Sequence, residues 1–251
     1  MSRSQRTKTD RTGQLEIFPT PSWAVTALLD CLRPRSGTFF EPCAGEGHIV
    51  RAVDAWFATN RPDEPPPTWE YTDIRPTRYA QPACDMARGD NLFSRRGRRF
   101  DTILTNPPFS RAFDLFHVLL PLAARSLAFL LPLSWLGSSE RANALRTWQP
   151  HLFVLPERPI FRGEGTDQEV YAWFVWARKS VTINVVEGIN APVLGYSLLR
   201  ILPATPIGVR RASEKAAFAE MPAEWHAEVA ARREARKQRE RERRDVSVVV
   251  R

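Results

Sequence analysis

An asparagine placed between an apolar run and two prolines carries the clearest chemical signal in this chain. Asn106-Pro107-Pro108-Phe109 directly follows residues 100–105, an apolar run that predicts a buried strand. An asparagine at such a strand end can hold the exocyclic amino group of a planar ring while that nitrogen attacks a methyl donor. Because the tripeptide Asn-Pro-Pro also occurs by chance in a proline-rich chain, its interpretation depends on the surrounding sequence.

A glycine-rich turn lies upstream, where Glu41–Gly47 (EPCAGEG) follows a short apolar stretch. Such a turn lets the backbone approach a ligand, and the N-terminus of the helix that follows favours negatively charged groups. The glycine spacing is not GxGxxG, so the fingerprint of a dinucleotide site is not matched. A tight strand-to-helix turn without a ligand is the alternative.

Two aspartates follow later strand-like segments. Asp73 lies at the end of a predicted strand over residues 69–74, where an acidic side chain can accept hydrogen bonds from ribose hydroxyls. Asp90 follows Gly89 near a weak third strand and could bind an adenine amino group. Both residues also fit ordinary turn positions, and that alternative stays open.

The last two predicted strands are expected to form a hairpin joined by a loop over residues 157–169. This loop would lie at the carboxyl edge of the sheet, beside the candidate site. Arg158 and Arg162 could hold phosphates there. Phe161 could contact a base from the side opposite Phe109, or it could pack under the loop.

Alternating strand and helix patterns must position these residues. Strands are predicted at residues 38–41, 69–74, 100–105, 126–131, 152–155 and 171–176, and helices at 49–59, 112–124 and 139–148. This alternation predicts an α/β fold with a parallel sheet covered by helices on both faces, and the closing hairpin adds an antiparallel strand. Pro121 is expected to end or kink the second helix.

Charge and composition limit the classes of partner. The net charge is +8 with a pI near 10.0, which favours a polyanion, although arginine-rich ends could inflate the charge of an ordinary core. Three separated cysteines predict neither a disulfide framework nor a zinc site, and they favour a reducing cytosol. The longest apolar run, residues 127–136, is too short to span a bilayer, and residues 1–11 do not resemble a secretory signal.

The chain is predicted to contain four segments: a flexible basic arm over residues 1–14, a catalytic domain over 15–179, an accessory segment over 180–211 and a charged helix or tail over 212–251. Within the last, residues 232–244 hold eight Arg or Lys against three Glu. This stretch could follow a nucleic-acid backbone, or it could form a solvated helix with i,i+4 ion pairs.

Taken in order, the glycine-rich turn, Asp73, Asp90 and Asn106–Phe109 resemble the motifs of class I S-adenosylmethionine-dependent N6-adenine methyltransferases. Residues 18–23 (FPTPSW), upstream of the turn, resemble the additional cofactor-side motif of the gamma-type enzymes. Residues 155–161 and 171–176 resemble small phage and prophage adenine methylases. The resemblance spans roughly residues 15–178 and implies a Rossmann-like, mostly parallel seven-stranded sheet with an antiparallel last strand.

The resemblance also implies the roles of individual residues. It assigns S-adenosyl-L-methionine as cofactor, with no metal, and a cofactor site made by Phe18, Thr20, Pro21, Glu41, Ala44, Gly45, Gly47, Asp73, Ile74, Asp90 and Asn106. Asn106 and the Pro107 carbonyl each accept one N–H of the target amino group, while Phe109 stacks on a flipped base. Transfer is direct, without a covalent enzyme intermediate.

The expected substrate is DNA in the cytoplasm, at the nucleoid. An N6-adenine methyltransferase acting on RNA is the main alternative, because phenylalanine after Asn-Pro-Pro also occurs in enzymes of that kind. A protein-glutamine methyltransferase and a catalytically silent nucleic-acid-binding module are further alternatives. The short region after the catalytic core, about seventy residues, predicts a short recognition site, a separate specificity subunit or a homodimer.

Overall fold

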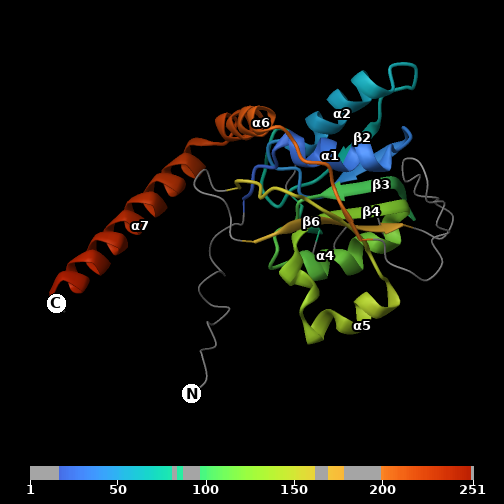
Figure 1. The fold of residues 1–251 in the computed structure, drawn as a ribbon. Helices are drawn as coiled ribbons and strands as arrows, with labels where there is room; N and C mark the ends of the chain where they lie inside the picture. Colours follow the sequence, from blue (N-terminus) through green and yellow to red (C-terminus); the bar gives the residue numbers. More distant parts are fainter. Residues whose placement is uncertain (1–16, 81–83, 87–96, 162–168, 178–198, 250–251) are drawn as a thin grey trace.

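The fold is known from a computed structural model, which describes residues 17–80, 84–86, 97–161, 169–177 and 199–249. Seven strands form one sheet in the order β2-β1-β3-β4-β6-β5-β7 (Figure 1). The strands are β1 (Thr38–Glu41), β2 (Thr68–Tyr71), β3 (Phe100–Thr105), β4 (Ala123–Pro132), β5 (His151–Val154), β6 (Tyr171–Ala177) and β7 (Leu199–Ile201). The helices are α1 (Ser22–Leu32), α2 (His48–Asn60), α4 (Ala112–Leu119), α5 (Ser139–Thr147), α6 (Ile207–Ala219) and α7 (Ala223–Val249), with 3-10 turns η3 (Leu120–Leu122) and η4 (Leu133–Leu136).

The mostly parallel seven-stranded sheet confirms the predicted fold class. β6 runs antiparallel to both of its neighbours, β4 and β5, and it forms the predicted hairpin with β5. The chain then adds β7, which pairs in parallel with β5 at the edge of the sheet. The antiparallel strand is therefore the sixth in the chain rather than the last.

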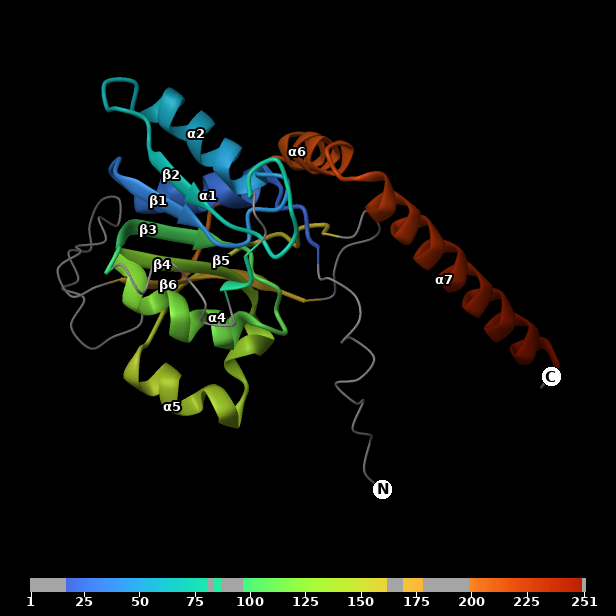
Figure 2. The same ribbon diagram turned by 180° about the vertical axis from the view of Figure 1, so that it is seen from behind.

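Helices cover both faces of the sheet, as the alternating pattern predicts. Figures 1 and 2 show α1 and α2 together on one face and α4 on the other. One apolar cluster joins α1 and α2 to the sheet, and a second joins α4 to the opposite face. Every residue of β6 from Tyr171 to Trp176 is buried, as expected for a central strand covered on both sides.

Several boundaries differ from the sequence-based expectation. β2 ends at Tyr71, so Asp73 lies in the loop after the strand. α4 ends at Leu119 and continues as η3, because Pro121 has no amide hydrogen to donate and cannot extend the helix. β4 therefore begins at Ala123. α1 had no counterpart among the helices predicted from the sequence.

The C-terminal part of the chain joins the same body. β7 extends the sheet beyond residue 179, where the sequence places the end of the catalytic domain, and α6 packs against α1. α7 then projects away from the sheet (Figures 1 and 2). The division into four segments stays a prediction, and the proposed arm at residues 1–14 lies outside the described residues. None of the helices in the described ranges combines the length and apolar composition that a membrane span requires.

Candidate functional site

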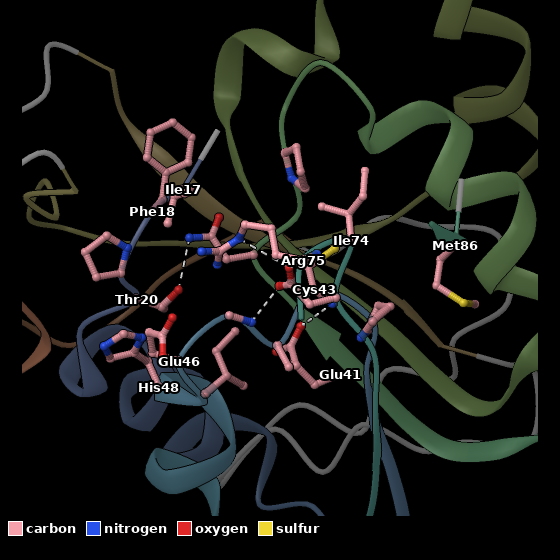
Figure 3. Close-up of a pocket in the computed structure, with 18 of the residues that line it drawn as sticks. Ile17, Phe18, Thr20, Glu41, Cys43, Glu46, His48, Ile74, Arg75 and Met86 are labelled. Carbon is pink, nitrogen blue, oxygen red and sulfur yellow. Dashed lines mark hydrogen bonds and ion pairs between the residues drawn. The ribbon is translucent and has the colours of Figure 1, made fainter. Parts of the chain in front are cut away.

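A pocket lies where β1, β2 and β3 end, and its empty volume is about 900 Å³ with open solvent at the mouth included. In an α/β sheet this carboxyl edge is the usual place for a ligand. Its walls come from the segment before α1, the glycine-rich turn, the loop after β2, the residues after β3 and the link between α6 and α7. Figure 3 shows Thr20, Glu41 and Arg75 around it, each from a separate segment of the chain.

Tight backbone geometry shapes the glycine-rich turn. Gly45 and Gly47 have φ angles of +50° and +78°, in the left-handed region that favours glycine. A Cβ atom on Gly47 would lie 2.2 Å from the ring of Tyr79. The turn therefore needs glycine at position 47 for its conformation and for the close approach of Tyr79, while Gly45 leaves its backbone open to the pocket.

Asp73 fastens this turn to the loop after β2. Its Oδ2 accepts a hydrogen bond from the Gly45 amide at 2.8 Å, and its Oδ1 accepts one from the Arg75 amide at 2.8 Å. The Arg75 Nε lies 3.4 Å from the same carboxylate. Asp73 lines the pocket, as its predicted cofactor role requires, and it also holds the turn in place, a role that the sequence did not reveal.

Glu41 is a buried acid at the base of the pocket. Its side chain is 1% exposed, and Oε1 accepts a hydrogen bond from the Cys43 amide at 3.1 Å. Burial raises the pKa of Glu41 to about 8, and the nearby Thr105 hydroxyl and Cys43 amide oppose this rise. Oε2 has no hydrogen-bond partner of normal geometry among the described residues. Near neutral pH this carboxyl therefore holds a proton, and a cationic ligand beside it would favour the ionised form.

Asn106 is held from one side only. Its amide Nδ2 donates a hydrogen bond to Thr20 Oγ1 at 3.0 Å, across 86 residues of sequence. Its Oδ1 is buried and has no hydrogen-bond partner in the described part of the chain. Leaving such an acceptor unpaired costs roughly 1–3 kcal/mol. Both residues line the pocket, and Oδ1 is the atom of Asn106 that could accept a hydrogen bond from a further N–H donor.

An aromatic cluster lies beside Asn106. Phe109 stacks on Phe18 with ring centroids 5.2 Å apart, and it also contacts Tyr171 at 5.8 Å. Phe161 packs edge-on against Tyr171 at 4.9 Å and is only 1% exposed. This burial favours packing under the loop over contact with a base for Phe161. Phe109 is half-buried and is not among the pocket residues, so its stacking role stays a prediction.

The pocket brings together most of the cofactor residues that the resemblance implies. Phe18, Thr20, Glu41, Ala44, Gly45, Asp73, Ile74 and Asn106 all line it. Pro21 and Pro107 are buried next to pocket residues, and Gly47 is the N-cap of α2. Arg158 is exposed and is not among the pocket residues, and Asp90 and Arg162 lie outside the described residues.

Other pocket residues were missed. Arg75, Asp85, Met86 and Arg111 carry no motif, and only their positions after β2 and β3 could have indicated them. Met221 is distant in sequence, and it reaches the pocket because the C-terminal segment folds back onto the body.

A set of polar contacts holds this C-terminal segment in place. His48 Nε2 donates a hydrogen bond to the Ala217 carbonyl at 3.0 Å, and Arg51 forms an ion pair with Glu220. Burial lowers the pKa of His48, and the hydrogen bond to the Ala217 carbonyl opposes this shift. Ser213 Oγ accepts a hydrogen bond from the Trp23 amide at 3.2 Å, near the start of α1. The C-terminal segment is therefore part of the pocket wall.

Comparisons with known proteins support the fold. No family model matches the chain, and no curated protein matches its sequence. The chain is similar to a Listeria monocytogenes structure assigned to the class I S-adenosylmethionine-dependent methyltransferases, with a TM-score of 0.51 and 11% identity. The match covers 83% of this chain and 73% of that one. The protein thus has the Rossmann-like fold found in class I methyltransferases.

Two further structures are similar at lower scores. A modification subunit assigned to a type I restriction enzyme of Vibrio vulnificus gives a TM-score of 0.48 and 16% identity over 67% of this chain. A type I restriction-modification methyltransferase subunit of Streptococcus thermophilus gives a TM-score of 0.47 and 13% identity over 84% of this chain. The chain spans 46% and 55% of these two proteins. The fold assignment rests on the first structure alone.

Proposed function

We propose that this protein transfers a methyl group from S-adenosyl-L-methionine to the N6 amino group of adenine in DNA. The single observation that carries the proposal is the unpaired, buried Oδ1 of Asn106 in the pocket, with the amide nitrogen of the same side chain fixed by Thr20. An amide oxygen held in this way accepts a hydrogen bond from an amino group.

The pocket residues fit the proposed cofactor. The glycine-rich turn offers close backbone approach, and the ammonium of a methionine moiety beside Glu41 would favour the ionised form of this buried carboxyl. Asp73 and Ile74 border the region where the ribose would lie. When bound, the cofactor supplies an electrophilic methyl group on a sulfonium.

The residues after β3 would then orient the nucleophile. Asn106 Oδ1 and the Pro107 carbonyl each accept one N–H of the adenine amino group, which favours a pyramidal nitrogen with a directed lone pair. An asparagine is not a base, so its contribution is orientation and electrostatic stabilisation as positive charge develops on the nitrogen. Transfer would form the N–C bond as the S–C bond breaks, with the sulfur keeping the electron pair, and the nitrogen would then lose a proton to water.

Adenine in a duplex must leave the base stack to reach such a pocket. Phe109 offers a stacking face next to Asn106, with Phe18 supporting its other face. A separate specificity subunit or a second copy of the chain would add contacts to the DNA.

The proposal is tested with labelled S-adenosyl-L-methionine, unmodified duplex DNA and, in parallel, total RNA, with the products digested to nucleosides. Label in N6-methyldeoxyadenosine is expected. Asn106→Ala should abolish it while cofactor affinity stays nearly unchanged, whereas Asn143→Ala, which alters an exposed asparagine on α5, should behave as wild type. Label only in N6-methyladenosine from RNA would contradict DNA as the substrate, and normal turnover by Asn106→Ala would remove the assigned catalytic role.

A further inference from the structure

Helix α7 starts at the wall of the pocket. Met221, in the link before α7, lines the pocket, and Trp225 Nε1 donates a hydrogen bond to the Ile17 carbonyl at 3.3 Å. Trp225 also stacks on Phe218 of α6, with ring centroids 5.7 Å apart. The first turn of α7 is therefore fixed against the segment that carries Phe18, and the rest of the helix projects from the body (Figures 1 and 2).

The basic positions of α7 gather on one side of the helix. At 100° per residue, the eight Arg and Lys positions between residues 232 and 244 fall within an arc of about 200°. Of the three acids in this stretch, only Glu240 falls inside that arc, while Glu234 and Glu242 lie outside it. Arg233, Lys237 and Arg241 follow one another at i,i+4 spacing, and their side chains are exposed.

We propose that α7 is an arm that binds the phosphate backbone of a nucleic acid and holds it beside the pocket. This inference rests on the proposed function, since it assigns the surface that holds the substrate of that site. Charge complementarity decides the partner, because residues 230–245 consist only of Ala, Arg, Lys, Glu, Gln and Asp. Such a stretch offers neither the apolar seam of a coiled coil nor the apolar face of a membrane-surface helix.

The ion pairs within α7 do not prevent this role. Arg232 pairs with Glu228, and Lys237 pairs with Glu234 at 2.8 Å, both on the solvent-exposed surface. Exposed pairs of this kind contribute only about 0–1 kcal/mol, so a phosphate can replace the carboxylate. At 1.5 Å per residue the basic stretch is about 18 Å long, which matches roughly five base pairs of a duplex.

The test removes three charges from the basic side without touching the anchored part of the chain. The variant is Arg233→Gln/Lys237→Gln/Arg241→Gln, since glutamine keeps a high helix propensity. Its matched control is Arg35→Gln/Arg99→Gln/Arg125→Gln, which removes the same charge from exposed positions near the amino ends of β1, β3 and β4. Affinity for a labelled duplex of about thirty base pairs, as DNA and as RNA, is measured by fluorescence anisotropy at several salt concentrations.

For the α7 variant, the slope of log K against log salt should become shallower by about 2–3, because each lost phosphate contact contributes about 0.9. Affinity at low salt should fall at least about tenfold, with DNA, RNA or both. The control should keep most of the wild-type slope. An unchanged slope in the α7 variant, or an equal change in the control, would overturn the proposal.

This experiment separates the arm from the reaction. Binding is measured with S-adenosyl-L-homocysteine, so no turnover is needed, and the affinity for that compound should be the same in both variants. If the wild-type protein methylates DNA and the α7 variant binds with the wild-type salt dependence, only the proposed role of α7 is refuted. If the α7 variant loses nucleic-acid binding and the wild-type protein methylates neither DNA nor RNA, only the proposed reaction is refuted.

Discussion

The side-chain amide of Asn106 donates a hydrogen bond to Thr20 Oγ1 at 3.0 Å and thereby joins the residues after β3 to the segment before α1. Thr20 is 4% exposed and Asn106 Oδ1 is buried, so the contact is shielded from water. Because the amide nitrogen is committed to Thr20, the oxygen must point elsewhere. Thr20 is thus a positioning residue for Asn106, and its effect on the reaction can be separated from an effect on cofactor binding.

Thr20→Val keeps the volume of the side chain but removes the acceptor. We expect kcat to fall by about 10- to 100-fold with a small change in cofactor affinity, because a misplaced orienting group slows the reaction without removing a binding contact. Thr20→Ser should restore most of the rate. Thr26→Val, which removes a hydroxyl that donates to the Trp23 carbonyl on α1, is the control for loss of a partly buried hydroxyl. Equal kcat values for Thr20→Val and wild type would contradict the positioning role.

The buried Glu41 should make stability depend on pH. Its pKa is about 8 in the folded chain against an ordinary value of 4.5, so between these values the folded state holds a proton that the unfolded state has lost. The free energy of unfolding should therefore fall as pH rises through this window, by roughly 1.4 kcal/mol per pH unit at most. Glu41→Gln cannot ionise and should remove this part of the dependence.

The measurement for Glu41 is urea unfolding of wild type, Glu41→Gln and Glu140→Gln at pH 5, 6 and 7, without cofactor. Glu140 is an exposed carboxylate on α5 and controls for the loss of one acid. Wild type and Glu140→Gln should lose stability in parallel, while Glu41→Gln loses less. Parallel lines for all three proteins would show that Glu41 does not hold its proton in the folded chain.

Asp73 should affect both stability and cofactor affinity. Asp73→Asn keeps the shape but cannot accept hydrogen bonds at both positions, so one of the Gly45 and Arg75 amides loses its partner. Hydrogen bonds to charged groups contribute about 1.5–3 kcal/mol, which corresponds to a Tm decrease of about 3–12 °C in a chain of this size. Cofactor affinity should fall about 10-fold or more, since the turn and the site change together.

Thermal unfolding and calorimetric titration with S-adenosyl-L-homocysteine measure both effects of Asp73→Asn. Asp63→Asn, in the exposed loop before β2, is the control. A variant with normal Tm and weak cofactor binding would limit Asp73 to ligand contact. Normal affinity with a lowered Tm would limit it to fastening the turn.

Much of the fold was predictable because apolar patterns in buried strands are strong local signals. β1 and β3 have the predicted bounds, and α2 differs from its prediction by one residue at each end. α1 was missed although Trp23, Ala24, Val25, Leu28 and Leu29 are buried, because no strand precedes it and Pro19 and Pro21 suggest a loop. Short-range patterns do not reveal a helix whose burial depends on contacts with α2 and α6.

The site was predictable only where residue type and order carry information. The glycine-rich turn and Asn106 belong to recognisable motifs, and both border the pocket. Met221 and the partners His48 and Arg51 could not be found in this way, since their roles arise from the C-terminal segment folding back over α1 and α2. Contacts between residues so far apart in the chain produce no recognisable spacing pattern in the sequence.

The ion pair between Arg51 and Glu220 predicts that the C-terminal segment controls cofactor affinity. Arg51→Glu and Glu220→Arg should each weaken binding of S-adenosyl-L-homocysteine several-fold, because like charges push Met221 away from the pocket, and the double variant should recover most of the affinity. Calorimetric titration with S-adenosyl-L-homocysteine measures the affinity of each variant. Arg232→Glu, which breaks the pair with Glu228 on α7, should leave affinity unchanged. If both single variants bind as wild type does, the link between α6 and α7 is a passive part of the wall.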